Sequence, residues 1–191
     1  MGGQPLRLWS IRVADAVQQP LLPNALSNAT VDENVPRWSP DGRQIAFTSN
    51  RQAGRYEIWV FDVQQPDTLH PLTVAYHDDR LNANIEQKVP AWSPDSTHIA
   101  YWQGVEGSDP RTDLPRDVWV MRADGSDPQW LTRGDDPNWS PDGSLISHSL
   151  PPLRPGSMPA IAAVQPDGGG ERVLLEVQVC RPLQSDWTNG G

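Results

Sequence analysis

The chain repeats one stretch, Val35-Pro36-Arg37-Trp38-Ser39-Pro40-Asp41-Gly42, and this repeat decides the fold. It recurs as Val89-Pro90-Ala91-Trp92-Ser93-Pro94-Asp95-Ser96 and as Pro137-Asn138-Trp139-Ser140-Pro141-Asp142-Gly143. A less similar fourth copy is Ser185-Asp186-Trp187-Thr188-Asn189-Gly190. The four tryptophans are 54, 47 and 48 residues apart, and such a period is typical of one supersecondary unit per repeat.

The Ser-Pro-Asp-Gly portion of the repeat predicts a type I turn. Serine suits its first position, proline fixes φ at the second and glycine suits the fourth. Such a turn joins two antiparallel strands. The tryptophan beside it is most simply a packing residue between neighbouring sheets. We therefore expect Trp38, Trp92 and Trp139 to lie in the core.

Each copy continues with the same apolar pattern. Seven residues after the tryptophan comes an aliphatic residue, and a ring follows two residues later, in the pairs Ile45/Phe47, Ile99/Tyr101 and Ile146/His148. This alternation predicts a strand with one buried face. Two further short apolar runs follow in each copy, and no segment shows a sustained helical period. Each repeat is therefore expected to form four short strands.

Composition supports an all-β chain. Among 191 residues there are 20 Pro and 15 Gly, which implies many chain reversals and leaves little room for long helices. The formal net charge of −9 argues against nucleic acid as a partner. No apolar run approaches the roughly 20 residues of a membrane span, so membrane insertion is not expected. The single Cys180 allows no intrachain disulfide, and Met1–Pro5 lacks the pattern of a signal peptide.

Four antiparallel strands per period of 47–54 residues, with one tryptophan each, indicate β-propeller blades. The pattern W-S-P-D-G-x-x-I-A-F…I-W-V…L-T resembles the TolB-type, WD-like β-propeller repeat. That family includes the propeller of the Tol–Pal system and the propellers of prolyl-oligopeptidase-like and tricorn-like proteases. The resemblance implies a periplasmic or extracellular location and says little about function, because the repeat is a structural unit used in many proteins.

We interpret the chain as a single propeller region, 1–191, cut through a blade at each end. Its parts are a part blade at 6–23, blades at about 35–73, 89–132 and 137–175, and the inner strand of a further blade at 178–188. Three alternatives stay open: a fragment of a larger propeller, an incomplete four-bladed ring, or two chains that complete one ring. Open blade edges also favour self-association.

The sequence contains none of the common catalytic or metal-binding motifs. It has no G-x-S-x-G elbow, no H-E-x-x-H or C-x-x-C spacing and no phosphate-binding glycine loop. We therefore predict no catalytic residue, no cofactor and no metal ligand in this chain.

Loops on one face are the best candidates for binding. We define the loop face by three loops, 49–57, 74–88 and 102–117, the last of which is unusually long. Long loops in compact domains are often functional. The candidate partner-binding residues on this face are Arg51, Arg55, His77, Asp78, Asp79, Trp102, Arg111 and Arg116. The alternative is that the arginines pair with nearby acids and that the polar loops are merely solvated.

Three functional hypotheses follow. The first is a non-enzymatic binding or scaffold module that presents the loop face to a protein or peptide. The second is an accessory, substrate-gating propeller of a peptidase or lyase whose catalytic domain lies outside this chain. The third is a decayed or truncated repeat protein with no independent role.

Overall fold

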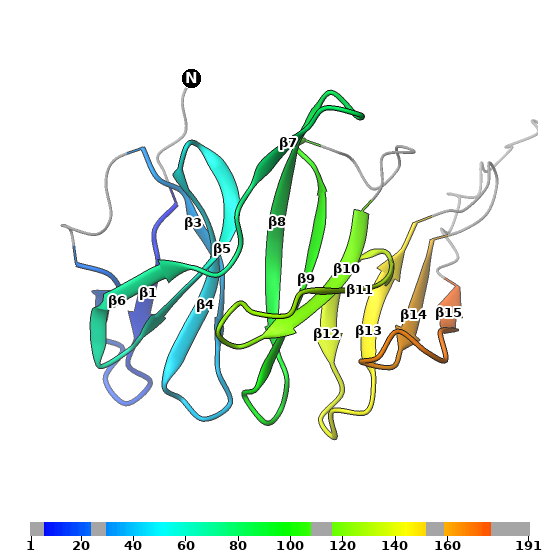
Figure 1. Cartoon of the computed structure of the whole chain (residues 1–191). Helices are drawn as coiled ribbons and strands as arrows, with labels where there is room; N and C mark the ends of the chain where they lie inside the picture. The colour runs from blue at the N-terminus through cyan, green and yellow to red at the C-terminus, as the bar shows by residue number, and fades with distance from the viewer. Residues whose placement is uncertain (1–5, 24–29, 108–115, 152–158, 177–191) are drawn as a thin grey trace, which may run out of the picture.

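Four antiparallel sheets stand side by side in the computed structural model, which describes residues 6–23, 30–107, 116–151 and 159–176 (Figure 1). Blade 1 consists of β3 (Glu33–Trp38), β4 (Gln44–Gln52), β5 (Arg55–Asp62) and β6 (Gln65–Pro71). Blade 2 consists of β8 (Ala83–Trp92), β9 (His98–Val105), β10 (Arg116–Arg122) and β11 (Gln129–Arg133), with β7 (Tyr76–Asp78) added at the β8 edge. Blade 3 consists of β12 (Asp135–Trp139), β13 (Ile146–Leu150), β14 (Ala160–Val164) and β15 (Arg172–Glu176).

A two-stranded sheet, β1 (Trp9–Ile11) and β2 (Gln18–Pro20), precedes blade 1. No helix occurs in the described ranges. The prediction of an all-β propeller made of four-stranded antiparallel blades is confirmed. The inner strand expected at 178–188, with its Trp187, lies outside the described residues.

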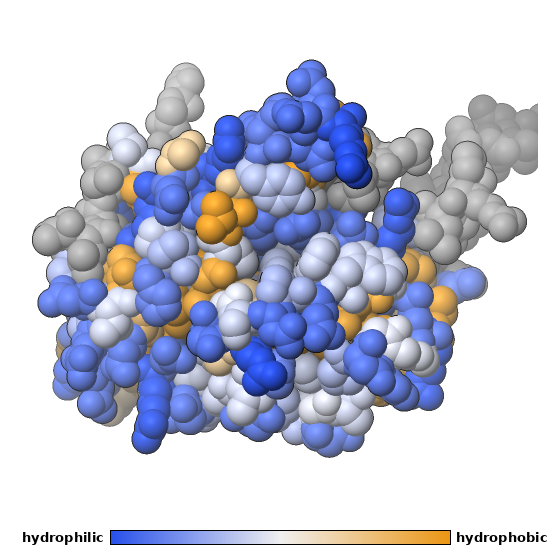
Figure 2. All heavy atoms as spheres, in the orientation of Figure 1, coloured by the Kyte–Doolittle hydropathy of each residue, from blue (hydrophilic) through white to orange (hydrophobic). Residues whose placement is uncertain are grey.

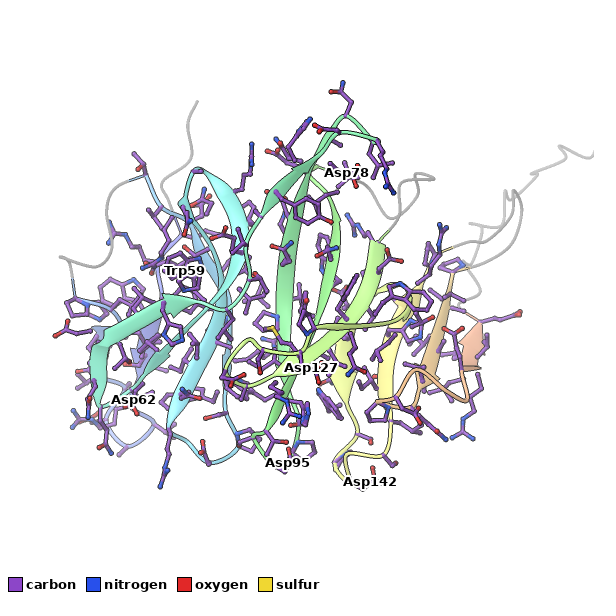
Figure 3. The ribbon with its side chains drawn as sticks, viewed as in Figure 1. Trp59, Asp62, Asp78, Asp95, Asp127 and Asp142 are labelled. Atoms are coloured by element: carbon purple, nitrogen blue, oxygen red, sulfur yellow. The ribbon has the colours of Figure 1, made fainter. Side chains whose placement is uncertain are left out.

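The Ser-Pro-Asp turn forms as predicted in all three blades. In each, the backbone N–H of the fourth residue donates to the serine carbonyl at 2.9 Å, and the serine hydroxyl donates to the aspartate at 2.6 Å. These hydrogen bonds lower the pKa of Asp95 and Asp142 to about 2. The fourth residue has positive φ, which suits Gly42 and Gly143 and is also adopted by Ser96. Local turn chemistry therefore sets the strand reversals (Figure 3).

Each inner strand contains a bulge at the residue before its proline. Val35, Val89 and Asp136 have φ between 50 and 56°, and the strand register shifts at each of them. A proline has no N–H to give to a neighbouring strand, and a bulge accommodates it within a paired sheet. The repeat thus fixes a backbone irregularity as well as a turn.

Tryptophans join the blades in one direction. The Trp92 indole N–H donates to the carbonyl of Arg37 in blade 1 at 3.1 Å, and the Trp139 indole N–H donates to the carbonyl of Ala91 in blade 2 at 3.1 Å. Around the first of these bonds, Trp92 packs with side chains of both blades, including Ile58. Trp92 and Trp139 therefore each cover the inner strand of the preceding blade.

Trp38 departs most from the expectation that all three repeat tryptophans are core residues; Trp139 is partly buried, and Trp92 alone is buried. The Trp38 side chain is 52% exposed, whereas that of Trp92 is 7% exposed. The residues described before blade 1 form only β1 and β2, and Leu8 and Leu22 of this segment pack on Phe47 and other side chains near the middle and outer strands. The described residues therefore offer Trp38 no preceding inner strand. Its exposure follows from the lack of a covering strand in this part of the structure, since its own motif is the same as that of Trp92.

Glycine allows the outer hairpins to approach the preceding blade. Gly125, in the turn between β10 and β11, has φ +84°, and a Cβ at this position would lie 2.8 Å from the carbonyl oxygen of Leu72. The Gly125 N–H also closes the turn by donating to Arg122. This turn thus also serves as an inter-blade contact.

Candidate functional site

The loop face lies opposite the Ser-Pro-Asp turns, and its loops are shorter than the sequence suggested. In Figure 3, Asp78 lies at one end of the blades, and Asp95 and Asp142 lie at the other. The expected loop 49–57 is wrong in extent: β4 and β5 continue until only Ala53 and Gly54 separate them. Both residues have positive φ, 54 and 73°, the pattern of a two-residue hairpin turn that keeps strands paired to their ends.

The expected loop 74–88 is largely a hairpin. β7 pairs with the first residues of β8, with Tyr76 opposite Ile85 and Asp78 opposite Ala83. Its tip projects beyond the neighbouring strands (Figure 1). The corresponding connection between β11 and β12 is a single residue, Gly134. The hairpin is therefore an addition to the blade 1–blade 2 connection.

Two of the candidate arginines form buried ion pairs. Arg51, in β4, donates to Glu33 at 2.8 Å, and its side chain is only 10% exposed. Arg116, at the start of β10, donates to Asp135 at 2.7 Å. Burial lowers the pKa of Arg51, and the neighbouring Glu33 opposes this shift. Both guanidinium groups are thus engaged inside the chain, where truncating one partner would leave a buried charge.

Trp102 lies beneath this face and not on it. Its side chain is 6% exposed. The Arg116 guanidinium lies 4.7 Å from the Trp102 ring centroid, and the Lys88 ammonium lies 5.6 Å from it. Lys88 also pairs with Glu86 at 2.7 Å. Trp102 therefore positions two cations through cation–π contacts.

The hairpin carries the exposed candidates. The His77 ring nitrogen Nδ1 lies 3.1 Å from the Asn84 side-chain oxygen, and Nε2 lies 3.8 Å from Asp79, which is almost fully exposed. Asp78 accepts the backbone N–H groups of Arg80 and Leu81 and so closes the hairpin tip. The structure thus groups these three candidates together, away from the buried ion pairs.

Two candidates remain to be placed. Arg55 is half-buried at the start of β5. Arg111 lies outside the described residues. Across the described ranges, no group of three or more His, Cys, Asp or Glu side chains is arranged to hold a metal ion. Those same ranges contain no helix of the length and hydropathy that crossing a membrane requires.

A cavity opens between blades 1 and 2 at the foot of the hairpin. We call it the inter-blade cavity; it has a volume of about 220 Å³. Blade 1 and the following segment supply the residues Leu72, Thr73 and Val74, and blade 2 supplies Gln87, Tyr101, Gln103, Trp119, Met121, Gly125 and Pro128. Val74 and Pro128 are exposed, so the cavity opens to the surface. In Figure 2 the hairpin end of the molecule is almost wholly hydrophilic, with apolar atoms near its foot.

The inter-blade cavity contains buried polar atoms without partners. Gln87 is 2% exposed and donates through Nε2 to the Gln103 side-chain oxygen at 3.1 Å. Its own oxygen Oε1 has no hydrogen-bond partner, and neither has the Trp119 indole N–H. Burial raises the pKa of Tyr101, so its hydroxyl stays protonated. Unpaired buried polar groups are costly, and a ligand that pairs with them recovers that cost.

Sequence reasoning did not select the residues of this cavity. Gln87 carries no motif, and the recurring ring position of Tyr101 indicates a packing role. Comparing the same position in successive blades could have identified Gln87. It aligns with the acid Glu33 of blade 1, and the loss of the carboxylate indicates that the two positions do not have the same partner.

Comparison with known proteins identifies the repeat. No family model matches the chain. The Tol-Pal system protein TolB of Anaeromyxobacter dehalogenans is 34% identical over 97 residues, which make up 51% of this chain and 18% of that protein. TolB of Alcanivorax borkumensis is 34% identical over 65 residues, 34% of this chain and 13% of that protein. The chain thus matches less than a fifth of the length of these relatives.

Solved structures show the same fold. A TolB-like protein from Agrobacterium tumefaciens superposes with a TM-score of 0.66 at 22% identity, over 90% of this chain and 55% of that one. A prolyl endopeptidase gives 0.60 at 17% identity, over 90% and 26%. The β-propeller domain of the Trilobed protease from Pyrococcus furiosus gives 0.51 at 14% identity, over 75% and 43%. These likenesses establish the propeller fold and not a function.

Proposed function

We propose that this chain, whose repeats are TolB-type β-propeller blades, is a non-enzymatic binding module that presents its loop face to a protein or peptide partner. The β7–β8 hairpin is the observation that carries the proposal. It extends the blade 1–blade 2 connection, and it exposes Val74, Tyr76 and Leu81 beside the charged groups of Asp79 and Arg80. Apolar side chains among charges on a projecting element suit protein recognition.

The candidate residues have two kinds of role on this face, structural support and contact with the partner. Arg51, Arg116 and Trp102 hold the strand ends in place through buried ion pairs and cation–π contacts. His77 and Asp79 stand on the exposed hairpin and provide polar contacts to the partner. Asp78 shapes the hairpin tip, and Arg55 extends the same face. Arg111 lies outside the described residues and stays a candidate from the sequence alone. Homology to Tol–Pal proteins supports a protein partner and a periplasmic location.

A hairpin substitution tests the proposal. The triple change Val74→Ser, Tyr76→Ser and Leu81→Ser removes the exposed apolar groups of the hairpin and leaves the blades intact. A matched control, Val13→Ser with Val17→Ser, alters two exposed valines beside β1. The purified chain is cross-linked to its partner in extracts of the source cells, and captured proteins are identified by mass spectrometry. We expect the hairpin variant to lose a partner that the control retains; equal capture by both variants would contradict the proposal.

A second candidate function is an accessory propeller that gates substrate for a peptidase or lyase domain outside this chain. The fold likeness to the prolyl endopeptidase favours it. The coding sequence on either side of this chain discriminates the two: an adjoining hydrolase domain supports gating, whereas further repeats support the binding module.

Self-association through an open blade edge is a further proposal, supported by the exposed indole of Trp38. Light scattering tests it. A mass equal to a single 21.2 kDa chain at high concentration would exclude it.

A further inference from the structure

Blade 1 contains its own guanidinium site. The Arg51 guanidinium carbon lies 5.3 Å from the Phe47 ring centroid and 5.0 Å from that of Trp59. The same group donates from Nη2 to Glu33 at 2.8 Å and from Nε to the Ser49 hydroxyl at 3.2 Å. Four side chains from three adjacent strands therefore surround one planar cation.

The inter-blade cavity is formed by the same four positions in blade 2. In blade 1, Phe47 lies opposite Trp59 and Glu33 lies opposite Ser49 in the strand register. The corresponding opposed pairs of blade 2 are Tyr101 with Trp119 and Gln87 with Gln103. All four of these residues line the cavity.

Among the described residues, blade 2 supplies no cation of its own to this site. Arg51 follows Phe47 by four residues, and the residue four positions after Tyr101 is Val105. The residues that line the cavity are all uncharged. The position of the acid Glu33 is occupied by Gln87, whose Oε1 is a buried acceptor without a partner. The cavity therefore retains the rings and an acceptor but lacks the group that fills blade 1.

We propose that the inter-blade cavity binds a guanidinium group, as carried by an arginine side chain of the partner. This inference rests on the proposed function and names the chemistry recognised at the loop face. A guanidinium is planar, stacks on aromatic faces, and presents several N–H donors and no acceptor. Those properties fit the Tyr101 and Trp119 rings and the free oxygen of Gln87. Anions do not fit, because aromatic faces are electron-rich and the chain carries a net charge of −9.

The blade 1 comparison also bears on the Trp119 indole N–H. The Trp59 indole N–H, at the equivalent position, makes no hydrogen bond to Arg51 although Arg51 occupies the site beside it. The rings thus contribute their faces to the cation, and the acceptor comes from the inner strand. An inner-strand amide in place of a carboxylate predicts a weaker, reversible site, which suits a partner that must be released.

Peptide titration tests the inference. The probe is an acetylated, amidated Ala-Arg-Ala peptide, compared with peptides that carry citrulline or lysine in place of arginine. The readout is the indole N–H resonance of Trp119 in a nitrogen–proton correlation spectrum, assigned by its loss in Trp119→Phe. We expect saturable shifts with the arginine peptide and at least fivefold weaker binding of the citrulline peptide, which has the same shape without charge.

A charge-restoring variant sharpens the test. Gln87→Glu recreates the blade 1 arrangement, and a charge-assisted hydrogen bond exceeds a neutral one by about 1.4 kcal/mol, or tenfold in affinity. Gln44→Glu, at the far end of β4, adds the same charge away from the cavity and is expected to leave affinity within twofold. Equal binding of all three peptides, no shift of Trp119, or an equal effect of the two variants would each refute the inference and leave a merely hydrated cavity.

Failure of this inference is separable from failure of the proposed function. If partner capture depends on the hairpin but the arginine peptide does not bind, only the guanidinium site is refuted. If the arginine peptide binds at Trp119 but the hairpin variant and its control capture the partner equally, only the role of the hairpin is contradicted.

Discussion

Replacing a repeat tryptophan by phenylalanine should destabilise the chain strongly in blade 2 and hardly at all in blade 1. Trp92→Phe and Trp38→Phe make the same chemical change at equivalent repeat positions. The Trp92 indole donates to the Arg37 carbonyl at 3.1 Å and is 7% exposed. Trp38 is 52% exposed and faces no preceding inner strand in the described residues. Comparing the two variants therefore separates the effect of losing the inter-blade contact from the effect of replacing tryptophan itself.

The expected magnitude follows from what each change removes. Trp92→Phe loses one hydrogen bond, about 1 kcal/mol, and leaves a carbonyl without its partner. The smaller ring also leaves unfilled volume, which adds about 1–2 kcal/mol. A total of about 2–3 kcal/mol corresponds to roughly 4–12 °C in melting temperature for a chain of this size. For Trp38→Phe we expect about 0.5 kcal/mol or less, as at ordinary surface positions.

Urea and thermal unfolding followed by circular dichroism measure both variants against the parent chain. Propeller blades stabilise one another as neighbours. Loss of a single sharp unfolding transition in Trp92→Phe would therefore show that this junction couples the unfolding of blades 1 and 2. Equal destabilisation by the two changes would refute the reasoning, since it would mean that the Trp38 side chain is packed in solution.

Three further perturbations have definite expected outcomes. Burial lowers the pKa of His148 below its ordinary 6.5. The contribution of its neutral form to the free energy of unfolding is therefore fully present above pH 6.5 and is lost as the pH falls through the lowered value. His148→Phe should abolish the resulting decline in urea midpoint between pH 7 and pH 5. Burial raises the pKa of Glu57 above 4.5, so its contribution is greatest at low pH and declines as the pH rises through the shifted value; Glu57→Gln should raise the melting temperature at pH 7 and not at pH 4. Gly125→Ala meets the Leu72 carbonyl at 2.8 Å and should cost about 2–4 kcal/mol in urea unfolding, whereas Gly107→Ala, with a similar φ and open space around it, should cost only about 1–2 kcal/mol.

The turns and strands could be predicted because their causes are local. The Ser39–Asp41 hydrogen bond and the φ of Gly42 depend on a few adjacent residues, and the spacing of Ile45 and Phe47 is a property of a single strand. The burial of His148 was likewise predictable, because it occupies the ring position of its repeat and is 2% exposed.

What could not be predicted depends on contacts between strands and between blades. Trp38 carries the same motif as Trp92 but is exposed, because no preceding inner strand covers it among the described residues. Arg51 was expected on a solvent-accessible loop, but the tight turn at Ala53-Gly54 keeps it in a strand, where Glu33 and two rings enclose it. A spacing pattern within one repeat contains neither kind of information.

The tryptophan hydrogen bond between blades always runs in the same direction, so each blade behaves as one complete unit of the propeller. Each blade brings its own tryptophan donor and offers one carbonyl to the tryptophan of the next blade: the Arg37 carbonyl accepts from Trp92, and the Ala91 carbonyl accepts from Trp139. A gene that duplicates or deletes a whole blade therefore keeps donors and acceptors in equal number at every internal junction, whereas a change of half a blade does not. Propeller size can consequently vary between related genes by whole units without any compensating change in the junctions themselves.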